Sequence, residues 1–220
     1  MNRLLPIVLV ALIAVAGGGY WYSQSTNTTV PLANVELVSS DGAEASSSEV
    51  VEMVMGAEDA PITLIEYASF TCPHCASFHE NVLKQLKTDY VDTGKVKFVF
   101  RDVYFDRFGL WASMVARCGG QERFFGIADL LMKSQSEWSR AGDPVAIADA
   151  LRKTGRLAGL EDDQLQACLQ DEDKAKALIA WYQKNASADD ISGTPTLIIN
   201  GEKHSNMSYK DLKAILDSKL

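Results

Sequence analysis

Two cysteines separated by two residues constrain this chain more than any other feature of its sequence. Cys72-Pro73-His74-Cys75 follows an apolar, strand-like segment (residues 62–68) and begins a helical pattern. This spacing places both sulfurs on one face of the first helical turn. One thiol of such a pair can attack a foreign disulfide, and the other can resolve the mixed disulfide that forms. We therefore predict a redox-active dithiol with Cys72 as the nucleophile and Cys75 as the resolving thiol.

The residues next to Cys72 favour its thiolate form. Pro73 suits the first helical turn, because the N–H group that proline lacks would have no intrahelical partner there. The free N–H groups of this turn and the positive end of the helix dipole stabilise a nearby thiolate. A protonated His74 would add a second positive charge beside the same sulfur. We expect a stabilised thiolate at Cys72.

A zinc site is the main alternative for a Cys-x-x-Cys pair. Such sites usually supply a second pair of Cys or His ligands at short spacing. The nearby candidates here are His74 and His79, and a set of Cys72, Cys75 and His79 lacks an evident fourth ligand. We therefore predict a redox site with no metal and no cofactor.

Composition and charge exclude several other classes of protein. The chain has 220 residues, of which 47% are apolar and 23% charged, which suits one large domain or a domain with an insertion. The net charge of −8 argues against nucleic-acid binding. Four cysteines are too few for a disulfide-rich scaffold, but their even number permits two pairs.

The N-terminal segment predicts export. Residues 1–23 combine a short basic start with an apolar run, and Ala-Val-Ala at 14–16 matches a signal-peptidase site. Counted through Tyr22, the run approaches the roughly 20 residues that span a bilayer. A cleaved signal peptide and an uncleaved membrane anchor therefore both remain open, and both place the cysteines where disulfides persist. Residues 24–49 are rich in small polar side chains and predict a flexible linker.

Hydrophobic periodicity predicts a strand–helix–strand unit around the cysteines. We expect strands over residues 50–55, 62–68 and 96–100, and a helix from the cysteines to about residue 90. The last two strands would be parallel and joined by a right-handed crossover.

The remainder of the chain changes from helices back to strands. Helical patterns occupy residues 110–118, 122–133, 144–154, 161–169 and 174–186. In the last of these, Ala175, Leu178, Ile179 and Tyr182 mark the expected inward face. A strand at 196–199, an Asn-Gly hairpin turn and a helix capped by Ser208 complete the chain.

The chain resembles the DsbA family of exported thiol–disulfide oxidoreductases. The matching features are Cys72-Pro73-His74-Cys75, Glu66 six residues before the first cysteine, the long helical insertion, and Gly193-Thr194-Pro195-Thr196 before the last strands. The resemblance covers about residues 50–220. It implies an α/β, thioredoxin-like fold with an inserted all-helical domain. The thioredoxin-like domain would comprise residues 50–106 and 189–220, and the helical insertion residues 107–188.

The resemblance also implies roles for residues outside the dithiol. Pro195 would be a cis-proline whose loop, with Thr194, faces the Cys72–Cys75 disulfide and binds the backbone of the substrate. Glu66 would be a buried acid that relays the proton of Cys75.

Two cysteines remain in the helical insertion. Cys118 and Cys168 lie fifty residues apart, and leftover cysteines in an oxidising compartment are more often paired than free. Some exported relatives carry a second disulfide in this domain, so we expect a structural disulfide between them.

The function implied by the resemblance is that of a monomeric periplasmic oxidase. It would introduce disulfides into reduced, unfolded exported proteins and be reoxidised by a quinone-linked membrane protein. The family is also known for a depressed pKa at the cysteine that corresponds to Cys72. We expect no nucleic acid among its partners.

Thr194 leaves the direction of the reaction open. The best-known oxidases of the family have valine at this position, whereas the disulfide isomerases have threonine. Isomerases also carry an N-terminal dimerisation domain, for which residues 24–49 are too few and too polar. An isomerase or reductase of the same fold, and a metal-binding or holdase-type assembly factor, remain as alternatives. A glutathione-dependent transferase or isomerase is disfavoured by the export segment and by Cys75.

Overall fold

A five-stranded mixed sheet forms the centre of the computed structural model, which describes residues 50–220. The predicted export segment and linker lie outside this range. Strand order is β1-β3-β2-β4-β5, with β2 and β3 parallel and the other neighbours antiparallel. The strands are β1 (Met53–Met55), β2 (Ile62–Ala68), β3 (Val96–Asp102), β4 (Thr196–Ile199) and β5 (Glu202–Ser205). This arrangement is the predicted thioredoxin-like α/β fold, although β1 is shorter than the strand expected at 50–55.

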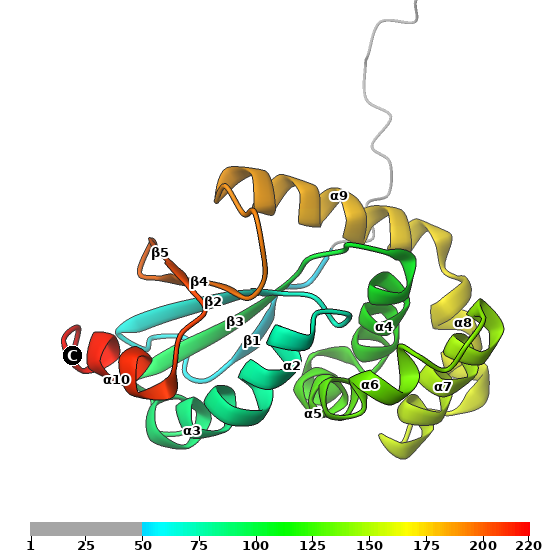
Figure 1. Cartoon of the computed structure of the whole chain (residues 1–220), viewed down its shortest axis with the longest axis horizontal. Coiled ribbons are helices and arrows are strands. Elements are labelled where there is room, and N and C mark those ends of the chain that lie inside the picture. Colours follow the sequence, from blue (N-terminus) through cyan, green and yellow to red (C-terminus); the bar gives the residue numbers. More distant parts are fainter. Residues whose placement is uncertain (1–49) are drawn as a thin grey trace, which may run out of the picture. The chain divides into compact units, whose positions relative to one another are not determined.

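One continuous helical stretch connects β2 to β3 and covers one face of the sheet (Figure 1). It consists of α2 (Pro73–Phe78), the π-helical segment η1 (His79–Leu83), α3 (Lys84–Leu86) and a second π-helical segment, η2 (Lys87–Val91). Cys72 is the N-cap residue of α2, and Pro73 lies in its first turn. The fixed φ angle of proline is compatible with a helix start, so the sequence places this helix end correctly.

Six helices lie between β3 and β4, where the helical patterns predicted five. They are α4 (Arg107–Cys118), α5 (Gly120–Lys133), α6 (Gln135–Trp138), α7 (Pro144–Leu157), α8 (Asp162–Gln170) and α9 (Glu172–Ala188). Helix α6 was not predicted, because a helix of 4 residues is too short to show a 3.6-residue period. The last helix, α10 (Tyr209–Asp217), begins after Ser208, whose hydroxyl accepts the N–H of Asp211. Among the described residues, no helix combines the length and apolarity needed to cross a bilayer.

The expected inward face of α9 was wrong at one position. Leu178 and Ala186 are buried and Tyr182 packs edge-on against Tyr104, so the buried stripe follows a spacing of four residues. Ile179 lies at the edge of this stripe and is 37% exposed.

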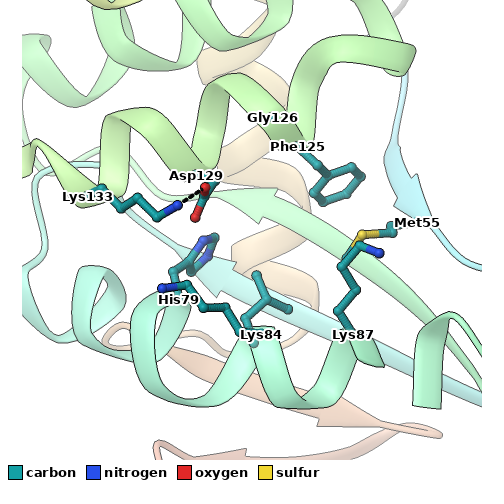
Figure 2. Close-up of a pocket in the computed structure, with 9 residues that line it drawn as sticks. Met55, His79, Lys84, Lys87, Phe125, Gly126, Asp129 and Lys133 are labelled. Atoms are coloured by element: carbon teal, nitrogen blue, oxygen red, sulfur yellow. Dashed lines mark hydrogen bonds and ion pairs between the residues drawn. The ribbon is translucent and has the colours of Figure 1, made fainter. Parts of the chain in front are cut away.

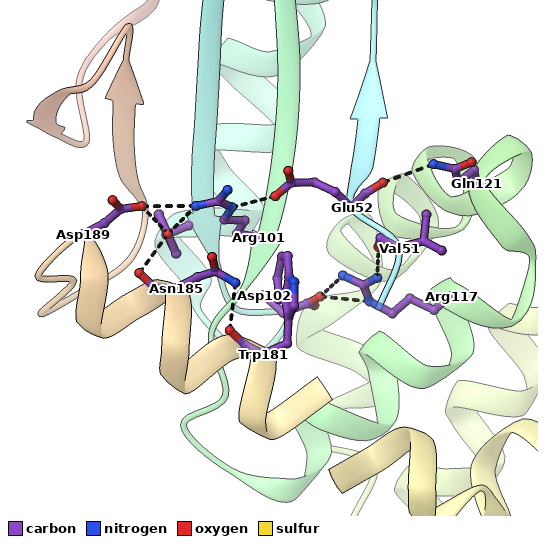
Figure 3. A network of polar contacts seen from close by, with 10 residues as sticks. Val51, Glu52, Arg101, Asp102, Arg117, Gln121, Trp181, Asn185 and Asp189 are labelled. Atoms are coloured by element: carbon purple, nitrogen blue, oxygen red, sulfur yellow. Dashed lines mark hydrogen bonds and ion pairs between the residues drawn. The ribbon is translucent and has the colours of Figure 1, made fainter. Parts of the chain in front are cut away.

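Two arginines connect the end of β3 to the helices (Figure 3). Arg101 of β3 forms an ion pair of 3.2 Å with Asp189, which follows α9. Arg117 of α4 donates two hydrogen bonds, of 2.7 and 3.1 Å, to the buried carboxylate of Asp102. It also donates to the carbonyl oxygen of Val51 at 2.9 Å. The inserted helices are therefore attached to the sheet by buried and half-buried charge pairs.

Candidate active site

The two cysteines differ sharply in accessibility. The side chain of Cys72 is half-buried, and its Sγ lies 3.5 Å from the carbonyl oxygen of Thr194. Cys75 lies one helical turn later and is fully buried, at 0% exposure. Both are free thiols, so the structure represents the reduced form of the pair. A foreign thiol or disulfide can reach Cys72, whereas Cys75 is enclosed beneath it.

The environment lowers the pKa of Cys72 to about 5. The largest cause is a hydrogen bond from the Cys75 thiol, and the backbone N–H groups of Cys75 and His74 act in the same direction. His74 thus contributes through its backbone, and its side chain is exposed. Burial has the opposite effect on Cys75, and together with the charge of Glu66 it raises the pKa of that thiol far above its ordinary value. One sulfur is therefore a stable thiolate and its neighbour a firmly protonated thiol.

The loop before β4 faces the dithiol and contains a cis peptide bond. Thr194–Pro195 is the cis bond, as the resemblance implied, and Pro195 is buried. The Oγ1 atom of Thr194 is buried and has no hydrogen-bond partner among the described residues. This loop therefore places a polar backbone and an unpaired hydroxyl beside the two sulfurs.

Glu66 is a buried carboxylate on the face of the sheet that carries the cysteines. Leu64 and Ala68 share this face, which packs against α2. Glu66 is 0% exposed, and its Oε2 lies 2.9 Å from Nε2 of His79. Its Oε1 has no partner within residues 50–220. A carboxylate with one unpaired oxygen close to a buried thiol is suited to exchanging a proton with it.

Two residues that the sequence did not single out hold the active-site loop. Gln135 of α6 donates hydrogen bonds of 2.8 Å to the carbonyl oxygens of both Phe70 and Cys72. Asp106, the N-cap of α4, accepts a hydrogen bond of 2.9 Å from the hydroxyl of Thr71. An Asp before a helix is a recognisable cap, but its second contact, across thirty-five positions of the chain, has no local signal.

The remaining cysteines form the expected second disulfide. Cys118 at the end of α4 is bonded to Cys168 in α8, with a sequence separation of 50. This bond joins two inserted helices and does not take part in the dithiol site. The third ligand considered for a metal site, His79, pairs with Glu66 instead. Within residues 50–220, no group of three or more potential metal ligands is present.

A thioredoxin-like sheet with an accessible thiolate, an enclosed thiol and a facing cis-proline defines a thioredoxin-fold dithiol protein. Comparison with known sequences agrees, since a family profile described as thioredoxin matches residues 48–218. The chain belongs to the thioredoxin family. The predicted resemblance to DsbA proteins is confirmed by structure: Wolbachia pipientis alpha-DsbA1 superposes with a TM-score of 0.71 at 28% identity. That match covers 76% of this chain and 89% of the Wolbachia chain.

Two relatives illustrate the sequence similarity. The chain is 34% identical over 167 residues to the "Putative protein-disulfide oxidoreductase" of Rickettsia bellii, covering 76% of this chain and 63% of the relative. It is 26% identical over 176 residues to "Disulfide bond formation protein D" of Bacillus subtilis, covering 76% of each. The matched region thus spans less than two thirds of the rickettsial protein.

Proposed function

We propose that this protein is a thiol–disulfide oxidoreductase that introduces disulfide bonds into exported proteins. The observation that carries the proposal is the contrast between the two thiols. A pKa of about 5 makes Cys72 a good leaving group. Because Cys75 is buried, external thiols and disulfides react with Cys72 alone. The names of the Rickettsia and Bacillus relatives support the same activity.

The first half of the reaction transfers the disulfide to the substrate. In the oxidised enzyme, a substrate thiolate attacks Sγ of Cys72, and the Cys72–Cys75 bond breaks. Cys75 leaves as a thiolate and takes up a proton, because its pKa is strongly raised. A second substrate thiolate then attacks the substrate sulfur of the mixed disulfide. The substrate is oxidised by two electrons, and Cys72 leaves as the stabilised thiolate.

The loop at Thr194–Pro195 positions the substrate in this scheme. Its cis bond presents backbone groups beside Cys72. An extended substrate segment can pair with these groups while its sulfur is aligned with Sγ of Cys72. Gln135 and Asp106 bind the loop that carries this sulfur, through Cys72 and Thr71.

We propose export to the periplasm as the setting of this activity, with residues 1–23 as signal or anchor. The substrates would be reduced, unfolded exported proteins, and a quinone-linked membrane protein would reoxidise the dithiol of a monomeric enzyme. The domain division at residues 107 and 188 belongs to the same proposal, since helices α4–α9 all lie between β3 and β4.

One observation favours a second candidate, a disulfide isomerase of the same fold. Thr194 stands before the cis-proline, and its buried hydroxyl has no partner within residues 50–220, which leaves it available to the sulfurs. An isomerase requires the mixed disulfide at Cys72 to persist while the substrate rearranges.

Trapping experiments test the proposed role of each cysteine. With Cys75→Ser, the mixed disulfide between Cys72 and a test protein that carries a disulfide should accumulate, because the enclosed thiol that would resolve it is missing. With Cys72→Ser, no mixed disulfide should form. Equal activity of Cys72→Ser and the unmodified enzyme would support a holdase instead, and would contradict the proposal.

A further inference from the structure

Behind the dithiol, a cavity of about 390 Å³ reaches the partner of Glu66. It lies between the helical stretch after Cys75 and helix α5 (Figure 2). Its lining residues are Met55, His79, Leu83, Lys84, Lys87, Phe125, Gly126, Asp129 and Lys133. We propose that His79 passes the proton of Cys75 between Glu66 and water in this cavity. The inference rests on the proposed oxidoreductase activity and adds a second proton carrier and an exit to it.

His79 is placed to exchange protons on two sides. Its Nε2 lies 2.9 Å from Oε2 of Glu66, while the side chain is only 3% exposed. Within the described residues, its Nδ1 makes no hydrogen bond, and this atom is not fully enclosed. Figure 2 shows the ring extending from η1 toward Asp129 and Lys133 across the cavity. His79 is therefore the connection between an otherwise enclosed carboxylate and the cavity.

Charged side chains line the cavity that the ring enters. Besides His79, the ionisable groups that line the cavity are Lys84, Lys87, Lys133 and Asp129. Lys133 pairs with Asp129, and Lys87 pairs with Asp92 outside the cavity. A π-helical segment also begins at His79, and such segments are frequent at functional sites.

The step can be written for closure of the reduced enzyme after Cys72 has formed a mixed disulfide. Cys75 gives its proton to the unpaired Oε1 of Glu66, and its thiolate attacks Sγ of Cys72. The Cys72–Cys75 bond forms, and the external thiolate leaves. Nε2 of His79 keeps the proton that it donates to Oε2 of Glu66, and the ring releases its Nδ1 proton to cavity water, so the Glu66–His79 pair holds the same number of protons before and after the step. When a substrate thiolate cleaves the Cys72–Cys75 disulfide, a proton moves along the same path in reverse, from cavity water to Cys75.

Single-turnover closure separates this role from the chemistry at Cys72. The reduced full-length enzyme is mixed with oxidised glutathione, quenched with acid and analysed by mass spectrometry. Formation of the mixed disulfide reports on Cys72, and its conversion to the intramolecular disulfide reports on deprotonation of Cys75. His79→Gln keeps a hydrogen-bond donor for Glu66 but cannot relay a proton. We expect mixed-disulfide formation within about twofold of the unmodified rate, and closure slowed by about tenfold or more.

Chemical rescue distinguishes a relay from a purely structural role. His79→Ala leaves space next to a cavity that is large enough for free imidazole, so added imidazole should restore fast closure to His79→Ala but not to His79→Gln. His204→Gln serves as control, because His204 does not line the cavity. Unchanged closure in His79→Gln, or slow closure of His79→Ala that imidazole does not restore, would overturn the inference. If the unmodified enzyme formed no mixed disulfide at all, the proposed function would fail instead.

Discussion

Gln135 of α6 donates a hydrogen bond of 2.8 Å to the carbonyl oxygen of Cys72, so an inserted helix holds the residue that carries the accessible sulfur. The same amide nitrogen bonds Phe70 at 2.8 Å, and Gln135 itself is buried. The helical insertion therefore completes the active-site loop. The geometry that directs backbone N–H groups at Cys72 depends on it.

Gln135→Ala should both destabilise the protein and weaken the thiolate. Two buried carbonyl oxygens lose a donor, which we expect to lower the free energy of unfolding by about 1–3 kcal/mol. The loosened loop should also raise the pKa of Cys72. Gln121→Ala is a matched control, because Gln121 bonds the backbone at Glu52 on the surface. Urea unfolding measures the stability of each variant, and thiolate absorbance measures the pKa of Cys72. Equal stabilities and equal pKa values in the two variants would contradict this account.

The reactivity of Cys72 should depend on pH with a midpoint near 5. The pKa of Cys72 is lowered to about 5 chiefly by the Cys75 thiol. Alkylation of the reduced protein should therefore remain fast down to pH 5, and Cys75→Ala should move the midpoint upward. A midpoint near that of an ordinary thiol, about 8.5, would contradict the assignment of Cys72 as a stabilised leaving group.

The stability of the reduced protein should increase with pH relative to that of the oxidised protein. Between pH 5 and about 8.5, the Cys72 thiol is ionised in the folded chain but still protonated in the unfolded chain. The unfolded state then binds more protons, so the free energy of unfolding of the reduced form rises with pH. This contribution is complete above about pH 8.5 and is lost as pH falls through 5.

Denaturant unfolding of both redox forms at several pH values measures this effect. The oxidised form is the control, because its Cys72 does not titrate. The unfolding free energy of the reduced form minus that of the oxidised form should increase from pH 5 to pH 8. A constant difference would show that the thiolate does not stabilise the fold.

Removal of the second disulfide should affect stability and leave the dithiol intact. Cys118 and Cys168 close a loop across 50 positions, and the chain-entropy model gives such a bond about 4 kcal/mol. The double variant Cys118→Ala/Cys168→Ala should unfold at lower urea concentration while Cys72 keeps its acidic midpoint. A lost midpoint with unchanged stability would show that this disulfide acts on the active site instead.

The sequence predicted the parts of the fold that local patterns encode. The apolar run of β2, Pro73 at the start of α2, and the Asn200-Gly201 turn are local features, and each appears at its predicted place. Contacts between distant segments escaped prediction. His79 was considered only as a metal ligand, and Gln135 lies in a helix too short to be recognised.

The cis-proline loop shows where resemblance supplied what local physics could not. Nothing in residues 193–196 requires a cis bond, since the trans form is the usual state before proline. The cis bond at Thr194–Pro195 was expected only because of the family resemblance, and it is present. The burial of Glu66 came from the same source, but its pairing with His79 depends on how η1 packs on the sheet.

The central claim is that the Cys72–Cys75 pair donates disulfides, and one paired measurement tests it most directly. The oxidised enzyme is added in parallel to a fully reduced test protein and to a scrambled, fully oxidised one. The account predicts stoichiometric oxidation of the reduced protein, with one substrate disulfide formed per enzyme dithiol, and little reshuffling of the scrambled protein. Strong reshuffling without net oxidation would contradict it and would assign the site, with Thr194 beside its sulfurs, to an isomerase.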